Sequence, residues 1–200
     1  MTGHRDWEAR YRQAPCLFGD DPSPLLTGHA QLLQPGGHAL AVGDGEGRNG
    51  VWLARRGLEV LSLDLSATAL ARARKRARQA GVTLTTCCSD ALAWRWPEHV
   101  FDVVTLIFVH LPPAQRHRLH RLMAKSLRPG GLVFIEAYHR RQRDCASGGP
   151  ADPDLLYTEA VLRRDFAGLE ILKLEEAATR VVVEGEDRGE GRVVHFIAQA

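Results

Sequence analysis

The chain has 200 residues, of which 44% are hydrophobic and 25% are charged, and its formal net charge is +2. This composition is ordinary for one folded domain with a substantial core, and it gives no reason to expect a nucleic-acid partner. No stretch approaches the roughly 20 apolar residues that span a bilayer. The polar N-terminus also lacks the apolar core of a signal peptide. We therefore expect a cytoplasmic protein that does not bind membranes.

Residues 1–24 precede the first predicted strand and form a polar segment with scattered aromatic and arginine side chains. Residues 7–11 are predicted to form a short helix, and residues 25–33 are predicted to form a second helix that ends before Pro35. We expect a single domain over residues 1–200, with residues 1–24 as its N-terminal arm or lid. Two alternatives stay open for this arm, which either folds over a pocket or packs on the surface.

The first predicted strand, at residues 40–42, leads into a loop rich in glycine. The loop contains glycines at positions 43, 45, 47 and 50. A strand, a glycine turn and a helix open a Rossmann-like unit, in which glycines let a ligand lie against the backbone. The second strand ends at Asp64, about 20 residues beyond the first glycine, where a carboxylate can accept hydrogen bonds from a ribose diol.

Helices and strands alternate through the rest of the chain. Ser66 is a predicted N-cap and Gly81 a predicted C-terminal stop for a helix over residues 67–79. Thr158 is predicted to cap a short helix that ends at Asp165. Further strands are predicted at residues 82–88, 100–109, 132–136, 169–176 and 192–198, with another helix at residues 113–127. This order predicts an α/β fold with a Rossmann-like, doubly wound sheet of seven strands, mostly parallel with a C-terminal antiparallel strand, and with helices on both faces.

The glycine loop alone does not identify the ligand, because residues 45–50 also fit the dinucleotide pattern GxGxxG. The charge of the loop argues against a dinucleotide, since Asp44 and Glu46 would repel its pyrophosphate by up to roughly a few kcal/mol. They would attract a ligand with cationic groups, such as the ammonium and sulfonium of S-adenosylmethionine. Asp64 would then bind the ribose hydroxyls, and Asp90 would accept a hydrogen bond from the adenine amino group.

Four motifs in order resemble those of class I S-adenosylmethionine-dependent methyltransferases. They are GDGEGRNGVWLA at residues 43–54, LSLDLS at 61–66, SDA at 89–91 and LRPGGLVFIEAY at 127–138. The chain is also similar to the short bacterial branch that includes the tellurite-resistance methyltransferases, through WxxRY at residues 7–11, FVHLPP at residues 108–113 and an acidic, glycine-rich hairpin near the end. In that hairpin, Asp187-Arg188 stands where the tellurite enzymes carry a His-Arg pair. The resemblance implies direct displacement, in which a lone pair of the acceptor attacks the sulfonium methyl and S-adenosylhomocysteine leaves.

The resemblance implies that the cofactor lies against the glycine loop and the ends of the strands. The residues expected to bind it are Gly43, Asp44, Gly45, Glu46, Gly47, Asn49, Asp64, Leu65, Ser66, Asp90, Ala91 and Phe108. His110 is the candidate for orienting the reactants, or for acting as a base toward an alcohol or amine, and a hydrogen bond to the start of the next helix is the alternative. Arg12 and Arg10 in the arm and Arg188 in the final hairpin are candidates for holding an anionic acceptor, with surface ion pairs as the alternative. No metal site is expected, because the four cysteines show no zinc-like spacing.

We therefore expect a methyltransferase that moves a methyl group from S-adenosylmethionine to a small-molecule acceptor, such as a metalloid oxyanion or a thiol. The expected second product is S-adenosylhomocysteine, and the expected form is a monomer or homodimer. Two alternatives stay open for the function: a non-catalytic sensor or scaffold that binds S-adenosylmethionine, and an NAD(P)-dependent oxidoreductase that uses the dinucleotide pattern.

Overall fold

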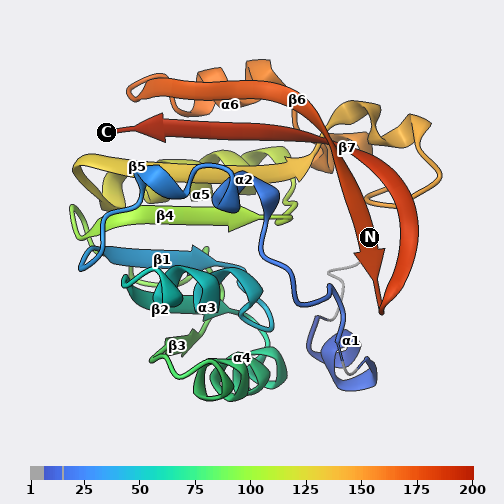
Figure 1. The fold of residues 1–200 in the computed structure, drawn as a ribbon. Helices are drawn as coiled ribbons and strands as arrows, with labels where there is room; N and C mark the ends of the chain where they lie inside the picture. The colour runs from blue at the N-terminus through green and yellow to red at the C-terminus, as the bar shows by residue number, and fades with distance from the viewer. Residues whose placement is uncertain (1–6, 15) are drawn as a thin grey trace.

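Seven strands form one sheet in the order β3-β2-β1-β4-β5-β7-β6, and the computed structural model describes residues 7–14 and 16–200. The strands are β1 (His38–Val42), β2 (Glu59–Asp64), β3 (Thr85–Cys88), β4 (Phe101–Ile107), β5 (Leu127–Tyr138), β6 (Glu170–Val183) and β7 (Glu186–Gln199). Strands β1 to β5 run parallel, whereas β7 runs antiparallel to both β5 and β6. The strand order reverses between β1 and β4, which places the ligand-binding edge at their C-terminal ends. The predicted fold is confirmed (Figure 1).

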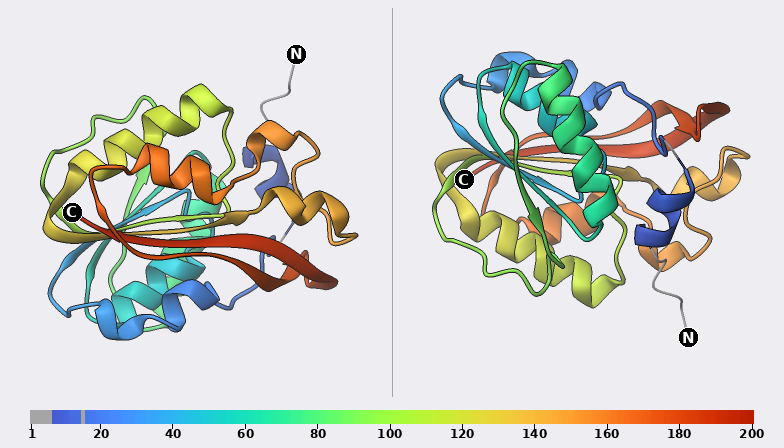
Figure 2. Two further views of the ribbon diagram at one scale, coloured as in Figure 1. Left: turned by 90° about the horizontal axis from the view of Figure 1, so that it is seen from above. Right: turned by 90° about the horizontal axis from the view of Figure 1, so that it is seen from below.

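Helices cover both faces of this sheet (Figure 2). They are α1 (Trp7–Gln13), α2 (Pro24–Thr27), α3 (Arg48–Arg55), α4 (Ala67–Gln79), α5 (Pro113–Ser126) and α6 (Glu159–Asp165), with the 3₁₀ helices η1 (Ala30–Leu32), η2 (Arg140–Asp144) and η3 (Pro153–Leu155). Helices α2, α3 and α4 pack on one face, where Leu53 and Ala73 join the buried core. Helices α5 and α6 pack on the other face through Met123 and Leu162. None of the helices that the structure describes is long and apolar enough to cross a membrane.

Three helix boundaries follow from local signals in the sequence. The Ser66 hydroxyl accepts a hydrogen bond of 3.0 Å from the Ala69 N–H at the start of α4. The Thr158 hydroxyl accepts one of 3.3 Å from the Val161 N–H at the start of α6. Gly81 follows α4 with a φ of 69°, a left-handed conformation that favours glycine. These predicted caps and the predicted stop are confirmed.

One predicted helix is broken in the structure. The helix expected at residues 25–33 is wrong, because the chain forms α2 and then the separate turn η1. Gly28 lies between them, and its N–H closes α2 through a hydrogen bond of 2.9 Å to the Pro24 carbonyl. Glycine is a poor helix former in a helix interior, which explains why the helix ends at this residue.

Strands β6 and β7 are longer than the strands predicted at residues 169–176 and 192–198, with 14 residues each. Charged residues and glycines dominate residues 184–191, so the sequence pattern does not indicate a strand there. The two strands pair with each other beyond the edge of the sheet, as in the pair Arg180 and Glu190. This β6–β7 ribbon curves past the C-terminal ends of the parallel strands toward α1 (Figure 1), and it contributes to the cavity described next.

Candidate functional site

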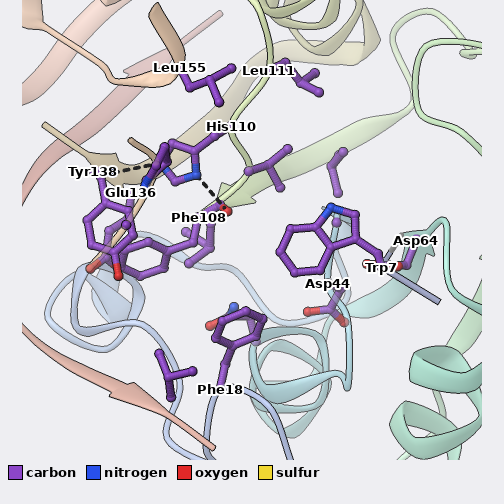
Figure 3. A pocket seen from close by; sticks show the side chains of 18 of the residues that line it. Trp7, Phe18, Asp44, Asp64, Phe108, His110, Leu111, Glu136, Tyr138 and Leu155 are labelled. Carbon is purple, nitrogen blue, oxygen red and sulfur yellow. Dashed lines mark hydrogen bonds between the residues drawn. The ribbon is translucent and has the colours of Figure 1, made fainter. Parts of the chain in front are cut away.

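A cavity of about 1130 Å³ lies at the edge where the strand order reverses. The residues that line it come from the glycine loop, the ends of β2, β4 and β5, helix α1, the segment 146–155 and the β6–β7 ribbon. Aromatic, aliphatic and charged side chains project into it (Figure 3). One drug-sized ligand occupies a pocket of roughly 300–1,000 Å³, so this cavity has room for a cofactor and a second small molecule.

The glycine loop passes close to neighbouring groups because side chains are missing from its bends. Gly43 has a φ of 64°, and a Cβ at this position would collide with a side chain of the β4–α5 loop. Gly45 has a φ of 57°, and a Cβ at this position would collide with the Tyr11 hydroxyl. Gly43 lines the cavity, whereas Gly45 and Gly47 are not among its lining residues and pack against Tyr11 and Ala73.

Asp44 is buried in this loop and binds the protein with both carboxylate oxygens. It accepts hydrogen bonds from the Gly50 N–H at 3.0 Å and from the Ser62 hydroxyl at 2.7 Å. Burial raises the pKa of Asp44 to about 6, although these two hydrogen bonds oppose the shift. Asp44 therefore braces the glycine loop against β2, and it also lines the cavity.

Glu46 holds the N-terminal segment against the loop. Its carboxylate accepts hydrogen bonds of 2.8 Å from the Leu17 N–H and of 2.8 Å from Nη1 of Arg72. Because the Arg72 charge compensates it, Glu46 adds less negative potential to the loop than its sequence position suggests. The predicted repulsion of a pyrophosphate therefore depends mainly on Asp44.

Asp64 ends β2 at the cavity, with its carboxylate held by the backbone. The Gly45 N–H donates to Oδ2 at 2.8 Å, and the Ser66 N–H donates to Oδ1 at 2.9 Å. Burial raises the pKa of Asp64, and the backbone hydrogen bonds oppose this shift. Because each carboxylate oxygen has two acceptor positions, the oriented group suits the pair of hydroxyls of a ribose.

The remaining residues expected to bind the cofactor divide between the cavity and the protein interior. Those that line the cavity are Asn49, Leu65, Asp90, Ala91 and Phe108. Oδ1 of Asp90 accepts a hydrogen bond of 2.8 Å from the Leu92 N–H, and Leu65 is 46% exposed. Ser66 is not among the lining residues, because its hydroxyl caps α4 and donates to Oε2 of Glu8 at 2.6 Å.

The arginines expected to hold an acceptor differ in position. Arg12 has a side chain that is 71% exposed, pairs with Glu8 at 3.0 Å and is not among the residues that line the cavity. Arg10 of the same helix does line it, with Cζ 5.0 Å from the centre of the Trp7 ring. Arg188 also lines it, and it pairs with a neighbouring glutamate at 2.7 Å. Within α1, the geometry therefore favours Arg10 over Arg12 for contact with a ligand.

The backbone engages both ring nitrogens of His110. Nδ1 lies 3.1 Å from the Phe108 carbonyl, and Nε2 accepts a hydrogen bond of 3.0 Å from the Tyr138 N–H (Figure 3). The ring lines the cavity and stacks on Tyr138 with centroids 5.4 Å apart. Because Nε2 already accepts a hydrogen bond, this arrangement disfavours the predicted role as a base. The ring joins the β4–α5 loop to β5, and its predicted role of orienting the reactants stays a prediction.

Among the charged residues that line the cavity, Arg48 and Glu136 were not predicted from the sequence as site residues. Arg48 is the first residue of α3, and Glu136 is fully buried near the end of β5. The one available signal was a carboxylate inside the apolar run LVFIEA. A buried charge is costly unless a partner or a ligand compensates it, so this position in a core strand indicates more than packing.

The groups around the cavity fit S-adenosylmethionine. Gly43 leaves bare backbone where a Cβ would collide, and Asp64 presents an oriented carboxylate for ribose hydroxyls. Oε1 of Glu136 is buried without a hydrogen-bond partner in the described part of the chain, so it can accept from a ligand donor. Among the described residues, no group of three or more potential metal ligands is present.

Comparisons of the sequence with known proteins agree with this geometry. Residues 39–131 match the family model described as a methyltransferase domain. The ubiquinone biosynthesis O-methyltransferase of Ralstonia nicotianae is 33% identical over a segment that covers 70% of this chain and 59% of the relative. The chain spans between 26% and 59% of the length of the first curated relatives that it matches.

Solved structures share the fold. The structure solved for "Conversion of a Disulfide Bond into a Thioacetal Group during Echinomycin Biosynthesis" has a TM-score of 0.81 and 23% identity, and the match covers 96% of this chain and 89% of that one. TehB from Haemophilus influenzae has a TM-score of 0.73 and 20% identity, and the match covers 87% of this chain and 60% of that one. Both likenesses concern the fold alone. The four ordered motifs, the matched domain and the shared fold make the chain similar to the class I S-adenosylmethionine-dependent methyltransferases.

Proposed function

We propose that this protein transfers a methyl group from S-adenosylmethionine to a small-molecule acceptor, within a single domain that spans residues 1–200. The observation that carries the proposal is the oriented carboxylate of Asp64 beside the glycine loop, in a cavity with room for two small molecules. When bound, S-adenosylmethionine supplies an already activated methyl group. The protein then has mainly to bind, align and desolvate the two reactants.

The N-terminal arm supports a site that excludes water. Tyr11 is buried against the glycine loop, and Trp7 and Phe18 line the cavity. Burial raises the pKa of Tyr11, and the nearby charge of Asp64 adds to the shift, so the phenol stays neutral. We infer that the arm folds over the pocket and does not merely pack on the surface. Residues 1–6 and residue 15 of the predicted arm lie outside the described residues.

The acceptor that we propose is a thiol or an oxyanion, which can present a nucleophilic lone pair without a dedicated base. Support comes from His110, whose Nε2 already accepts a backbone hydrogen bond. Arg10 and Arg188 line the cavity and can attract negative charge. The relative from Ralstonia nicotianae is named as an O-methyltransferase of ubiquinone biosynthesis, so phenols belong in the test as well. We expect a monomer or homodimer with no nucleic-acid or membrane partner.

The test measures release of S-adenosylhomocysteine by mass spectrometry from the purified protein with S-adenosylmethionine and a panel of acceptors. The panel contains thiols, selenite, tellurite, arsenite, phenols and small carboxylates. We expect turnover with at least one thiol or oxyanion. Titration calorimetry with S-adenosylmethionine and S-adenosylhomocysteine separates binding from transfer.

Three outcomes would contradict this proposal in different ways. If neither nucleoside gives a binding heat or a thermal shift, the methyl donor is wrong. If both bind but no acceptor in the panel turns over, a sensor or scaffold becomes the better explanation. If NAD(P) binds tightly and S-adenosylmethionine is excluded, the protein is an oxidoreductase.

A further inference from the structure

Tyr157 lies behind the cavity wall and contacts the backbone on both sides of His110. Its hydroxyl donates a hydrogen bond of 3.1 Å to the Val109 carbonyl, and its N–H donates one of 2.9 Å to the Tyr138 carbonyl. These three neighbours line the cavity, whereas Tyr157 is 1% exposed and is not among the lining residues. Its ring stands edge-on against the His110 ring, with centroids 5.9 Å apart. Tyr157 can therefore affect a ligand only through the residues that separate it from the cavity.

The loop that Tyr157 holds has a backbone conformation that needs support. Phe108, the first residue after β4, has a φ of 56°, which residues other than glycine rarely adopt. The Val109 side chain fills the space beside Gly43, where a Cβ on the glycine would collide with it. Such a backbone persists only when the surrounding structure holds it in place. Loss of the hydrogen bond at the Val109 carbonyl should therefore shift the loop that carries His110.

Asp165 fixes the position of the proton on two histidines behind Tyr157. Its Oδ1 lies 2.9 Å from Nδ1 of His117, and its Oδ2 lies 2.9 Å from Nδ1 of His120. Burial by itself would raise the pKa of Asp165, but hydrogen bonds from both histidines and from Arg164 hold this pKa well below its ordinary value. An ionised carboxylate can only accept hydrogen bonds, so both Nδ1 atoms carry protons.

The ring of His120 stays neutral at neutral pH although it contacts a carboxylate. It is fully buried, and burial lowers the pKa of His120. Arg116 and His117 add to this shift, whereas the hydrogen bond to Asp165 opposes it. A neutral imidazole that carries its proton on Nδ1 has an acceptor at Nε2. In His120 this acceptor lies 3.4 Å from the Tyr157 hydroxyl.

The Tyr157 hydroxyl therefore has one proton for two acceptors. Burial raises the pKa of the Tyr157 phenol, so this proton is not lost. The Val109 carbonyl at 3.1 Å is the nearer acceptor, and Nε2 of His120 at 3.4 Å is its competitor. Because hydrogen bonds weaken with distance, the geometry favours Val109. Removal of the competing acceptor should strengthen the hydrogen bond to the loop.

We propose that Tyr157 is a positioning residue for methyl transfer, and that His120 controls how firmly the Tyr157 hydroxyl holds the Val109 carbonyl. Tyr157 touches neither reactant and acts through the loop that carries His110. The inference deepens the proposed function and rests on it for the reaction itself. The competing explanation is that the network only joins α5 to α6. In that case, loss of the hydroxyl lowers stability and leaves the site unchanged.

The nuclear magnetic resonance signal of the Val109 carbonyl carbon tests the competition, since this signal moves downfield when the oxygen accepts a stronger hydrogen bond. Tyr157→Phe removes the donor, so we expect an upfield shift. His120→Asn keeps a donor for Asp165 but has no acceptor at the Nε2 position, so we expect a smaller downfield shift. His117→Ala is the matched control, because it removes a hydrogen bond to the same carboxylate from the exposed side. It should leave the Val109 signal in place.

Steady-state kinetics with an acceptor from the panel tests the positioning role. We expect Tyr157→Phe to lower kcat about 5- to 10-fold, as for one lost neutral hydrogen bond, and to change KM for S-adenosylmethionine less than about threefold. His120→Asn should keep at least the wild-type kcat, because the hydroxyl still holds the loop. Arg121→Gln, at an exposed position of α5, is the kinetic control and should match wild type.

Shifts of the Val109 carbon in the same direction for Tyr157→Phe and His120→Asn, or no shift for either, would overturn the competition for one proton. An unchanged kcat in Tyr157→Phe would overturn the positioning role and leave the hydroxyl a part in stability alone. If Tyr157→Phe does not fold, a downfield shift in His120→Asn supports the inference and an upfield shift overturns it. If no acceptor turns over while the shifts have opposite signs, the proposed function fails and the hydrogen-bond relay stands, which is a distinct result.

Discussion

Asp44 changes its charge within the neutral pH range, because burial raises its pKa to about 6. A raised pKa means that the carboxyl keeps its proton up to about pH 6 and is ionised above it. A cationic ligand in the cavity favours the ionised form. The affinity of such a ligand should therefore increase as the pH rises through 6.

We predict that the affinity for S-adenosylmethionine rises about tenfold between pH 5 and pH 7, because the ionised fraction of a group with a pKa near 6 changes by about that factor. S-adenosylhomocysteine, which lacks the sulfonium charge, should respond less. Asp44→Asn should flatten the dependence for the sulfonium compound. Calorimetry at the two pH values checks this, and a wild-type affinity that does not vary with pH would contradict it.

At the scale of elements, one glutamate attaches the arm helix α1 to α4. Glu8 accepts hydrogen bonds of 2.6 Å from the hydroxyls of Ser66 and Thr68. These hydrogen bonds lower the pKa of Glu8 to about 2. The carboxylate also lies at the N-terminus of α4, where the helix dipole favours negative charge. A lowered pKa means that the ionised contact persists at neutral pH and is lost only as the pH falls through about 2.

We expect Glu8→Ala to accelerate amide hydrogen exchange over α1 several-fold, because the helix loses its main polar attachment to α4. Arg12→Ala is the matched control, since Arg12 lies on the same helix and contacts Glu8 from the solvent side. It should leave the exchange almost unchanged. Equal acceleration in both variants would mean that the attachment depends on the Arg12 ion pair.

At the scale of the whole molecule, a buried polar network ties α5 and α6 to the rim of the site. Asp165 binds Nδ1 of His117 and Nδ1 of His120, each at 2.9 Å, and the Tyr157 hydroxyl donates to the Val109 carbonyl at 3.1 Å. Burial by itself would raise the pKa of Asp165. Hydrogen bonds from His120 and His117 outweigh this effect and hold the pKa of Asp165 well below its usual range. The ionised group therefore stabilises the fold above its unfolded pKa near 3.9, and this stability is lost as the pH falls toward its folded pKa.

Asp165→Asn should lower the free energy of unfolding by about 3 kcal/mol at pH 7, because a buried network loses its charged acceptor. For a chain of this size, that loss corresponds to a melting temperature lower by about 6–12 °C. The difference in melting temperature between Asp165→Asn and wild type should shrink below pH 4. Asp144→Asn, at an exposed position, should melt like wild type. Thermal melts at both pH values measure the effect, and a constant difference would show that the Asp165 charge contributes little.

Much of the fold could be predicted because its signals are local. The glycine bend, the Ser66 and Thr158 caps and the apolar strands each depend on residues close together in the chain, where spacing alone defines the geometry. Asp64 belongs to the same class, because its place at the end of a strand determines which edge of the sheet it reaches. These features led to the methyltransferase fold and to the cavity.

The roles of the charged side chains were decided by tertiary structure. Glu46 pairs with Arg72 of α4, and His110 is bound by the backbone of Tyr138 at the end of β5. Arg48 and Glu136 meet at one cavity although they come from separate elements. The amino-acid sequence shows which groups are costly to bury, whereas only the folded chain shows which partner compensates each charge. The physical reason is that an ion pair or hydrogen bond depends on distance in space, and separation along the chain does not determine that distance.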